Sequence, residues 1–173
     1  MRIISGPSAL ICSLFAAILL AGCALKVEGM IANRLPTNSI AHQAVIVSVS
    51  GGNHATLLNT NLVSDETFSA ALVQSLRKTG MFQSVQATGN ASYKLDALLT
   101  QIIDHPSVTF GLKVDWKLTR APDHIVWSGQ TKAFFRGQAR PTFVDLEHLR
   151  IATEEAVREN IEQALANLAA LNF

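Results

Sequence analysis

The strict alternation between residues 109 and 119 constrains the fold of this chain more than any other feature. Five apolar side chains occupy every second position and are separated by polar or small ones: Phe110, Leu112, Val114, Trp116 and Leu118. Because successive side chains of a strand point to opposite faces of a sheet, the pattern predicts a strand with one buried and one solvent-facing side. Burial on one side only is typical of antiparallel sheets.

A second strand is expected to pair with this one as a hairpin. Residues 121–123, Ala-Pro-Asp, predict a turn, and the segment 125–137 then returns as the partner strand. The simplest register predicts these pairs on the buried side: Leu118 with Ile125, Trp116 with Trp127, and Phe110 with Ala133. We therefore expect the two indoles to face each other as a core pair.

Three further strands and a helix are predicted before this hairpin. The strands are expected over residues 44–50, 81–85 and 92–103, with a weaker signal for another near Leu57 and Leu58. Ser64 is a good N-cap for a helix over 65–79, and Gly80 suits its C-cap. The predicted buried side chains in the helix and in the third strand are Phe68, Ala71, Leu72, Leu76, Tyr93, Leu95, Ala97 and Leu99.

A long helix is predicted over residues 146–170. Its apolar stripe consists of Val157, Ile161, Ala164, Leu165 and Leu168, and the charged residues Glu154, Glu155, Arg158, Glu159 and Glu162 are expected mostly to face water. Glu154 and Arg158 are spaced for an i,i+4 ion pair. The element order predicts an α+β two-layer sandwich, in which a mainly antiparallel sheet, with its later strands as a meander, carries two helices on one face.

The N-terminus has the pattern of a secretory signal. Arg2 is followed by an apolar run over 9–20, which is short for a membrane span, and then by small residues that end at Cys23. One alternative is an ordinary signal peptide with a chance cysteine. Residues 20–23, Leu-Ala-Gly-Cys, resemble the lipobox of bacterial lipoproteins.

The lipobox resemblance implies a covalent anchor. It implies cleavage between Gly22 and Cys23, a diacylglyceryl group on the Cys23 thiol and an acyl chain such as palmitate on its new amino group. Ala24, where the family has Asp in proteins kept at the inner membrane, implies the periplasmic face of the outer membrane. The expected division is a signal peptide over 1–22, a lipidated tether over 23–40, in which Met30 and Ile31 could touch the fold, and one domain over 41–173.

Charge and cysteine content exclude several classes of function. Arg2 is the only charged residue in the part to be removed, so 13 of the 14 Lys and Arg residues remain against 13 Asp and Glu. A neutral chain lacks the basic face that nucleic-acid binding requires. Cys12 leaves with the signal and Cys23 would carry lipid, so no internal disulfide is expected and no cofactor other than the lipid.

No motif predicts catalysis. The five histidines show no metal-ligand spacing, and the Asp-His pairs at 104–105 and 123–124 fall at opposite ends of one predicted strand. We therefore expect a protein without enzymatic activity. Lys113, Asp115 and Lys117 share the solvent-facing side of the central strand; a plain solvated surface is the first explanation for them, and a face that binds a partner is the alternative.

The order of elements over about 44–168 resembles that of several small envelope lipoproteins. These include the lipopolysaccharide-assembly lipoprotein that plugs its barrel partner and the activator lipoproteins of peptidoglycan synthases. The resemblance implies a lipid-anchored accessory protein that binds a protein partner in envelope assembly or maintenance. The alternative is a transport-auxiliary module that binds a lipid or a glycan between helix and sheet.

Overall fold

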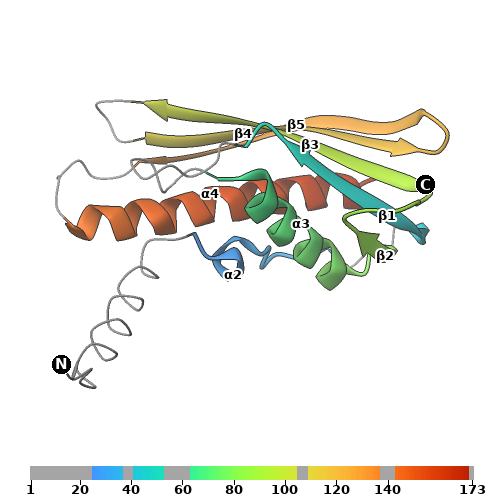
Figure 1. The fold of residues 1–173 in the computed structure, drawn as a ribbon, viewed down its shortest axis with the longest axis horizontal. Helices are drawn as coiled ribbons and strands as arrows, with labels where there is room; N and C mark the ends of the chain where they lie inside the picture. The colour runs from blue at the N-terminus through green and yellow to red at the C-terminus, as the bar shows by residue number, and fades with distance from the viewer. Residues whose placement is uncertain (1–24, 37–40, 53–62, 105–108, 137–142, 172–173) are drawn as a thin grey trace, which may run out of the picture.

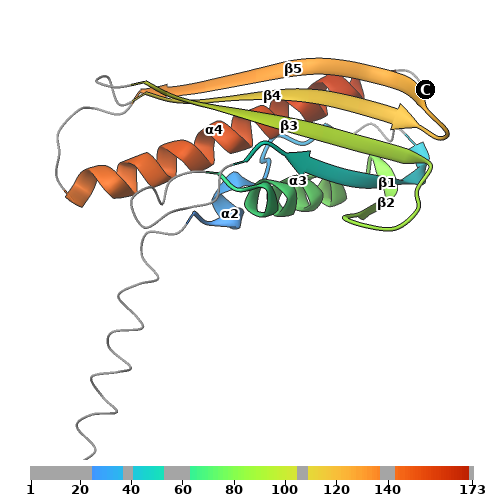
Figure 2. The same cartoon turned by 45° about the horizontal axis from the view of Figure 1, so that its top comes forward.

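The computed structural model describes residues 25–36, 41–52, 63–104, 109–136 and 143–171, which form an α+β fold (Figure 1). Its elements, in chain order, are α2 (Val27–Met30), β1 (Ala41–Ser50), α3 (Asp65–Thr79), β2 (Phe82–Gln86), β3 (Tyr93–Asp104), β4 (Thr109–Arg120), β5 (His124–Arg136) and α4 (Phe143–Ala169). Figure 2 shows the sheet as one layer and the helices as a layer on one of its faces, as predicted. The expected strand near Leu57 and Leu58 lies outside the described residues.

The described strands form one sheet in the order β2-β1-β3-β4-β5, which corrects the expected meander. β1 lies between β2 and β3 and pairs with both in parallel. Parallel neighbours need a crossover connection, and α3 supplies it between β1 and β2. The sheet is therefore mixed, with antiparallel pairing along the longer strands β3, β4 and β5.

The alternation of apolar residues in β3 and β4 is confirmed. Their buried side chains form the inner face of the sheet, and those of Leu95, Leu112, Val114 and Leu118 have essentially no exposed surface. Trp116 is buried too, and its ring centroid lies 6.0 Å from that of Phe68 on α3. The helix layer and the inner face thus share one hydrophobic core.

The predicted register of the β4–β5 hairpin is wrong. Leu118 lies opposite Trp127, so Trp116 faces Gly129 and Leu112 faces Ala133. Pairing next to the turn, with Arg120 opposite His124, is already one residue away from the predicted register, and a register shift between Leu118 and Thr119 then leaves one extra residue on β5. The expected pair of indoles does not form. Ile125, predicted to be buried, lies opposite Thr119 on the other face and is 58% exposed.

The capping signals of α3 are confirmed. The Ser64 hydroxyl accepts a hydrogen bond from the Thr67 backbone N–H, and Gly80 ends the helix at a φ of 64°. Only glycine adopts that left-handed conformation without strain. The predicted apolar stripe, which includes Phe68 and Leu72, is buried against the sheet.

A chain of buried hydrogen bonds joins the sheet to α4. The Trp116 Nε1–H donates to the Thr131 hydroxyl at 2.8 Å, and that hydroxyl donates to the Asn160 side-chain oxygen at 2.7 Å. The Asn160 amide nitrogen donates in turn to the carbonyls of Leu112 and Ala156. Because buried polar groups are costly unless paired, these bonds fix how α4 sits on β4 and β5.

Candidate functional site

The face of the sheet turned away from the helices is the first candidate site. We call it the outer face and define it by the side chains that β3, β4 and β5 direct away from the core: Lys94, Asp96, Leu98, Lys113, Asp115, Lys117, Ile125, Ser128, Gln130, Lys132 and Phe134. The residues predicted to form a partner-binding face, Lys113, Asp115 and Lys117, all belong to it.

Four of the six charged side chains on the outer face form ion pairs with near neighbours. The Lys113 ammonium lies 3.4 Å from the Asp115 carboxylate, and the Lys94 ammonium lies 2.7 Å from that of Asp96. The pKa of Asp115 is lowered, chiefly because Gln130 donates a hydrogen bond to its carboxylate, with Lys113 and Lys132 adding to the effect. The outer face therefore presents fixed charges of both signs near neutral pH.

Large apolar side chains stand among these charges. Leu98 is 50% exposed, and Phe134, which lies opposite Gly111, is 59% exposed. Ile125 joins them because the register shift moved it to this side. The register places Leu98, Ile125 and Phe134 apart from one another, so they are three separate apolar side chains on a polar face.

One end of the outer face is hollowed into an open groove of about 950 Å³. Its floor is formed by strand residues, among them Lys94, Asp96 and Lys117, and its walls by the 88–92 connection and the 121–123 turn. Both polar and apolar residues line it. The predicted residue Lys117 lines this groove, whereas Lys113 and Asp115 lie farther along the strand.

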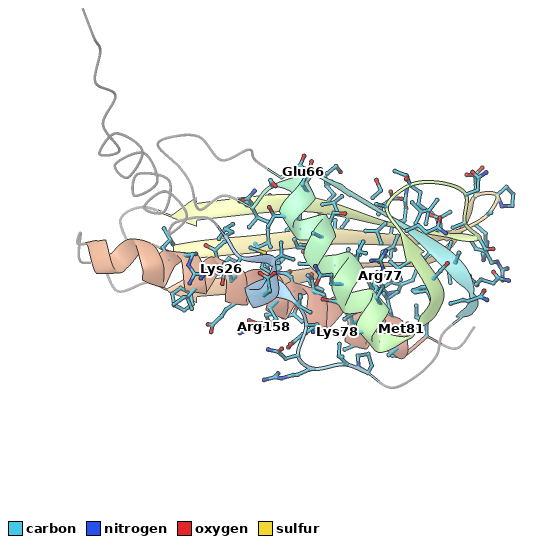
Figure 3. All side chains as sticks on the ribbon, turned by 60° about the horizontal axis from the view of Figure 1, so that its bottom comes forward. Lys26, Glu66, Arg77, Lys78, Met81 and Arg158 are labelled. Carbon is cyan, nitrogen blue, oxygen red and sulfur yellow. The ribbon has the colours of Figure 1, made fainter. Side chains whose placement is uncertain are left out.

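The second candidate is the segment that follows the lipobox. We call residues 25–36 the N-terminal segment; much of it packs on the domain, and Met30, Ile31 and Ala32 are buried, so the suggested contacts of Met30 and Ile31 are present. α2 contacts α3 and α4 and none of the described strands. Figure 3 shows Lys26 and Arg158 on the side of the molecule where α2 lies, away from Met81 at the end of α3.

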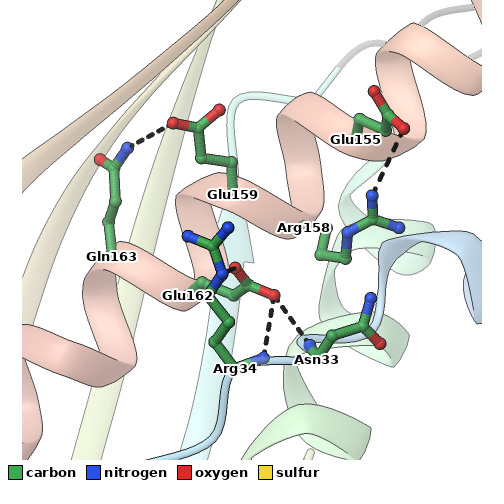
Figure 4. Close-up of polar contacts among 7 residues, drawn as sticks. All are labelled: Asn33, Arg34, Glu155, Arg158, Glu159, Glu162 and Gln163. Atoms are coloured by element: carbon green, nitrogen blue, oxygen red, sulfur yellow. Dashed lines mark hydrogen bonds and ion pairs between the residues drawn. The ribbon is translucent and has the colours of Figure 1, made fainter.

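Polar side chains of α4 hold the backbone of this segment. Glu154 accepts a hydrogen bond from the Lys26 N–H at 2.7 Å, and Arg158 donates to the Gly29 carbonyl at 3.0 Å. Glu162 accepts from the N–H groups of Asn33 and Arg34, as Figure 4 shows. Glu154, Arg158 and Glu162 are spaced by four and so share one side of the helix.

Two expectations about α4 are corrected by these contacts. Glu154 is buried, not solvent-facing, because the N-terminal segment covers it. Its ion pair is with Arg150, one turn earlier, while Arg158 pairs with Glu155 at 3.5 Å, so the predicted pair of Glu154 with Arg158 is wrong. A side chain at Gly29 would collide with the Glu154 carboxylate, which shows how closely α2 and α4 approach each other.

The described residues contain no group of three or more His, Cys, Asp or Glu that could hold a metal ion. Asp123 and His124 are both exposed at the β4–β5 turn, at the end of β4 opposite to Asp104. None of the helices in the described part of the chain is long and apolar enough to span a bilayer.

Comparison with known proteins identifies the fold and no more. No protein-family model matches the chain, and no curated protein does. Protein XCC0632 from Xanthomonas campestris, of family-model DUF330, aligns with a TM-score of 0.55 and 14% identity over 83% of this chain and 94% of its own. PelC from Paraburkholderia phytofirmans, solved as a dodecamer, aligns with a TM-score of 0.53 and 14% identity over 80% of this chain and 96% of its own.

A third structure carries a lipoprotein name. The minor lipoprotein from Acinetobacter baumannii aligns with a TM-score of 0.50 and 8% identity, over 76% of this chain and 93% of its own. Identities this low establish a common fold only. The α+β fold described above therefore also occurs in that minor lipoprotein.

Proposed function

We propose that this chain is a lipoprotein, anchored through lipid on Cys23 to the periplasmic face of the outer membrane, which binds a protein partner in assembly or maintenance of the cell envelope. The observation that carries the proposal is the combination of a lipobox with a folded domain whose outer face is left uncovered by the helices. The occurrence of the fold in a solved lipoprotein supports it.

The outer face is the surface on which we place the partner. It combines exposed apolar anchors, such as Phe134 and Leu98, with charges of both signs. Apolar anchors supply contact area, and a mixed charge pattern selects one partner by matching its charges. An anionic lipid or a nucleic acid would instead require clustered positive charge.

The experiment combines fractionation with site-specific crosslinking. Wild type should sediment with the outer membrane, and Cys23→Ser should not. A photocrosslinking residue in place of Lys117 should then capture one envelope protein, whereas the same residue in place of Gln74, which is exposed on α3, should not. Equal adducts from both positions, or none from the outer face, would contradict the proposed surface, and equal solubility of both forms would contradict the anchor.

The groove favours a second candidate function, binding of an envelope glycan. Its volume suits a ligand of a few sugar rings, and hydroxyl, amide and charged groups line it together with Ile46, Pro122 and Ile125. This hollow lies on the outer face and not between helix and sheet, where the transport-auxiliary alternative placed its ligand. Titration of the Cys23→Ser domain with envelope oligosaccharides tests it, since saturable binding that Lys117→Ala weakens is expected only from a groove ligand.

A further inference from the structure

The distance between the anchor and the folded domain is set by very few bonds. Cys23, which would carry the lipid, is two residues before Leu25, and Leu25 already packs against the core. Consecutive Cα atoms are ~3.8 Å apart, so the lipidated residue lies within roughly 8 Å of the domain whatever conformation those two bonds adopt. A tether over residues 23–40 would allow several times that reach.

The N-terminal segment is also held along its length. Met30 is fully buried, the Ala32 N–H donates to the Ser75 hydroxyl on α3 at 2.9 Å, and the Asn33 N–H donates to Glu162 on α4 at 2.8 Å. These contacts join residues far apart in sequence on two different helices. Release of the segment would open the core, so it cannot lengthen into a free tether while the domain stays folded.

The side of the domain next to the anchor follows from these contacts. The Lys26 N–H bonds to Glu154, so the chain leaves toward Cys23 beside that turn of α4. Ile151, which lies three residues before Glu154 and is therefore its neighbour on the helix surface, is 40% exposed. Since α2 lies on the helices and touches none of the described strands, this side is opposite to the outer face.

Charge around the anchor is balanced. Among the described side chains of residues 25–30 and 149–158, the charged ones are Lys26, Glu28, Arg150, Glu154, Glu155 and Arg158, three of each sign. Such a surface is neither repelled by anionic headgroups nor recruited by them. Its approach to a bilayer would depend on the lipid and on the short connection alone.

We infer that the N-terminal segment holds the domain directly against the bilayer in one orientation, with the Ile151 side of α4 at the lipid surface and the outer face directed away from it. This inference rests on the proposed lipid anchor at Cys23. In this orientation the membrane surface covers the Ile151 side of α4, and the outer face stays open to a partner.

The test measures depth at two positions in vesicles. The mature chain has no thiol other than that of Cys23, so a cysteine introduced as Ile151→Cys or Lys117→Cys can be labelled alone with a fluorophore. Lipidated protein is placed in phosphatidylcholine vesicles that contain headgroup nitroxide lipids. We expect quenching at position 151 to be several-fold stronger than at position 117, and equal quenching would overturn the inference.

Two controls separate the orientation from the anchor. Vesicle flotation of wild type beside Cys23→Ser tests the lipid itself; failure of wild type to float would remove the proposed function. A flexible Gly/Ser linker of about twelve residues after Ala24, with a mean span near 20 Å, should leave flotation intact and reduce quenching at 151 to the level at 117. If quenching at 151 survives the linker, the short connection does not set the orientation and the inference is wrong.

Discussion

On the outer face, charged side chains bond to neighbours two residues or one strand away, whereas the N-terminal segment bonds to residues 43 to 129 positions later in the chain. The outer-face charges are solvated, so each pair adds little to stability. The contacts of residues 26–32 are partly or wholly buried, and their loss would expose core. Side chains on the outer face can therefore rearrange to bind a partner without loss of the fold. The N-terminal segment cannot, because its contacts are part of the fold.

Trp116→Ala should have the largest effect, because it removes the core beneath the outer face. The indole is 2% exposed and bonds to Thr131, so its loss creates a cavity and ends a buried hydrogen bond. We expect the free energy of unfolding of the lipid-free Cys23→Ser domain to fall by about 3–5 kcal/mol. Denaturant titration measures this, and a loss below about 1 kcal/mol would show that the indole is not a core residue.

Met30→Ala asks whether the N-terminal segment belongs to the core. The side chain has no exposed surface, so truncation should cost about 2–4 kcal/mol in the same titration. Leu35→Ala is the matched control, because Leu35 lies in the same segment but is exposed and should change stability by less than about 0.5 kcal/mol. If Met30→Ala and Leu35→Ala both have small and equal effects, the segment adds nothing to the core and acts only as a tether.

Glu154→Gln weakens one polar contact between α4 and the N-terminal segment. The amide oxygen can still accept from Lys26, but the ion pair with Arg150 loses its negative charge, and we expect a loss of about 1–3 kcal/mol. Glu159→Gln, at an exposed position of the same helix, should change stability by only a few tenths of a kcal/mol. If both substitutions behave alike, Glu154 is not buried as described.

Asp115→Asn should have the smallest effect. Its pKa is lowered in the folded state, so the carboxylate stabilises the fold fully above its unfolded pKa of about 4 and loses that contribution as pH falls through the lower folded value. Because the side chain is 40% exposed, we expect a difference from wild type below about 0.5 kcal/mol at pH 7 that shrinks as the carboxylate becomes protonated in acid. A difference that grows on acidification would contradict the sign of the shift.

Periodicity predicted the outer face because a strand's two-residue repeat fixes which side chains share a face, and Lys113, Asp115 and Lys117 are placed by that repeat alone. The same rule failed for Ile125. One extra residue in β5 reverses which side chains of that strand point to each face, and no residue type at that position predicts the extra residue. The caps of α3 could be predicted for a similar reason, because Ser64 and Gly80 act on backbone that lies next to them in the sequence.

The contacts of the N-terminal segment could not be predicted in this way. Glu154, Arg158 and Glu162 read as a solvent-facing charged stripe, and only the fold brings residues 26–34 onto them. The parallel pairing of β1 with β3 was missed for the same physical reason, because strand order depends on contacts between distant segments and not on the local pattern. The role of Cys23 in anchoring stays a prediction from the lipobox.

The contact between α2 and α4 can form only late in the synthesis of the chain. Residues 26–34 leave the ribosome early, yet their partners on α4 come near the end of synthesis, and β1 must likewise wait for β3. Contacts of such long sequence separation form slowly. A chain that stops before residue 154 would therefore lack the helix surface on which residues 26–34 dock, so the N-terminal segment can reach its folded position only after the last helix has been made.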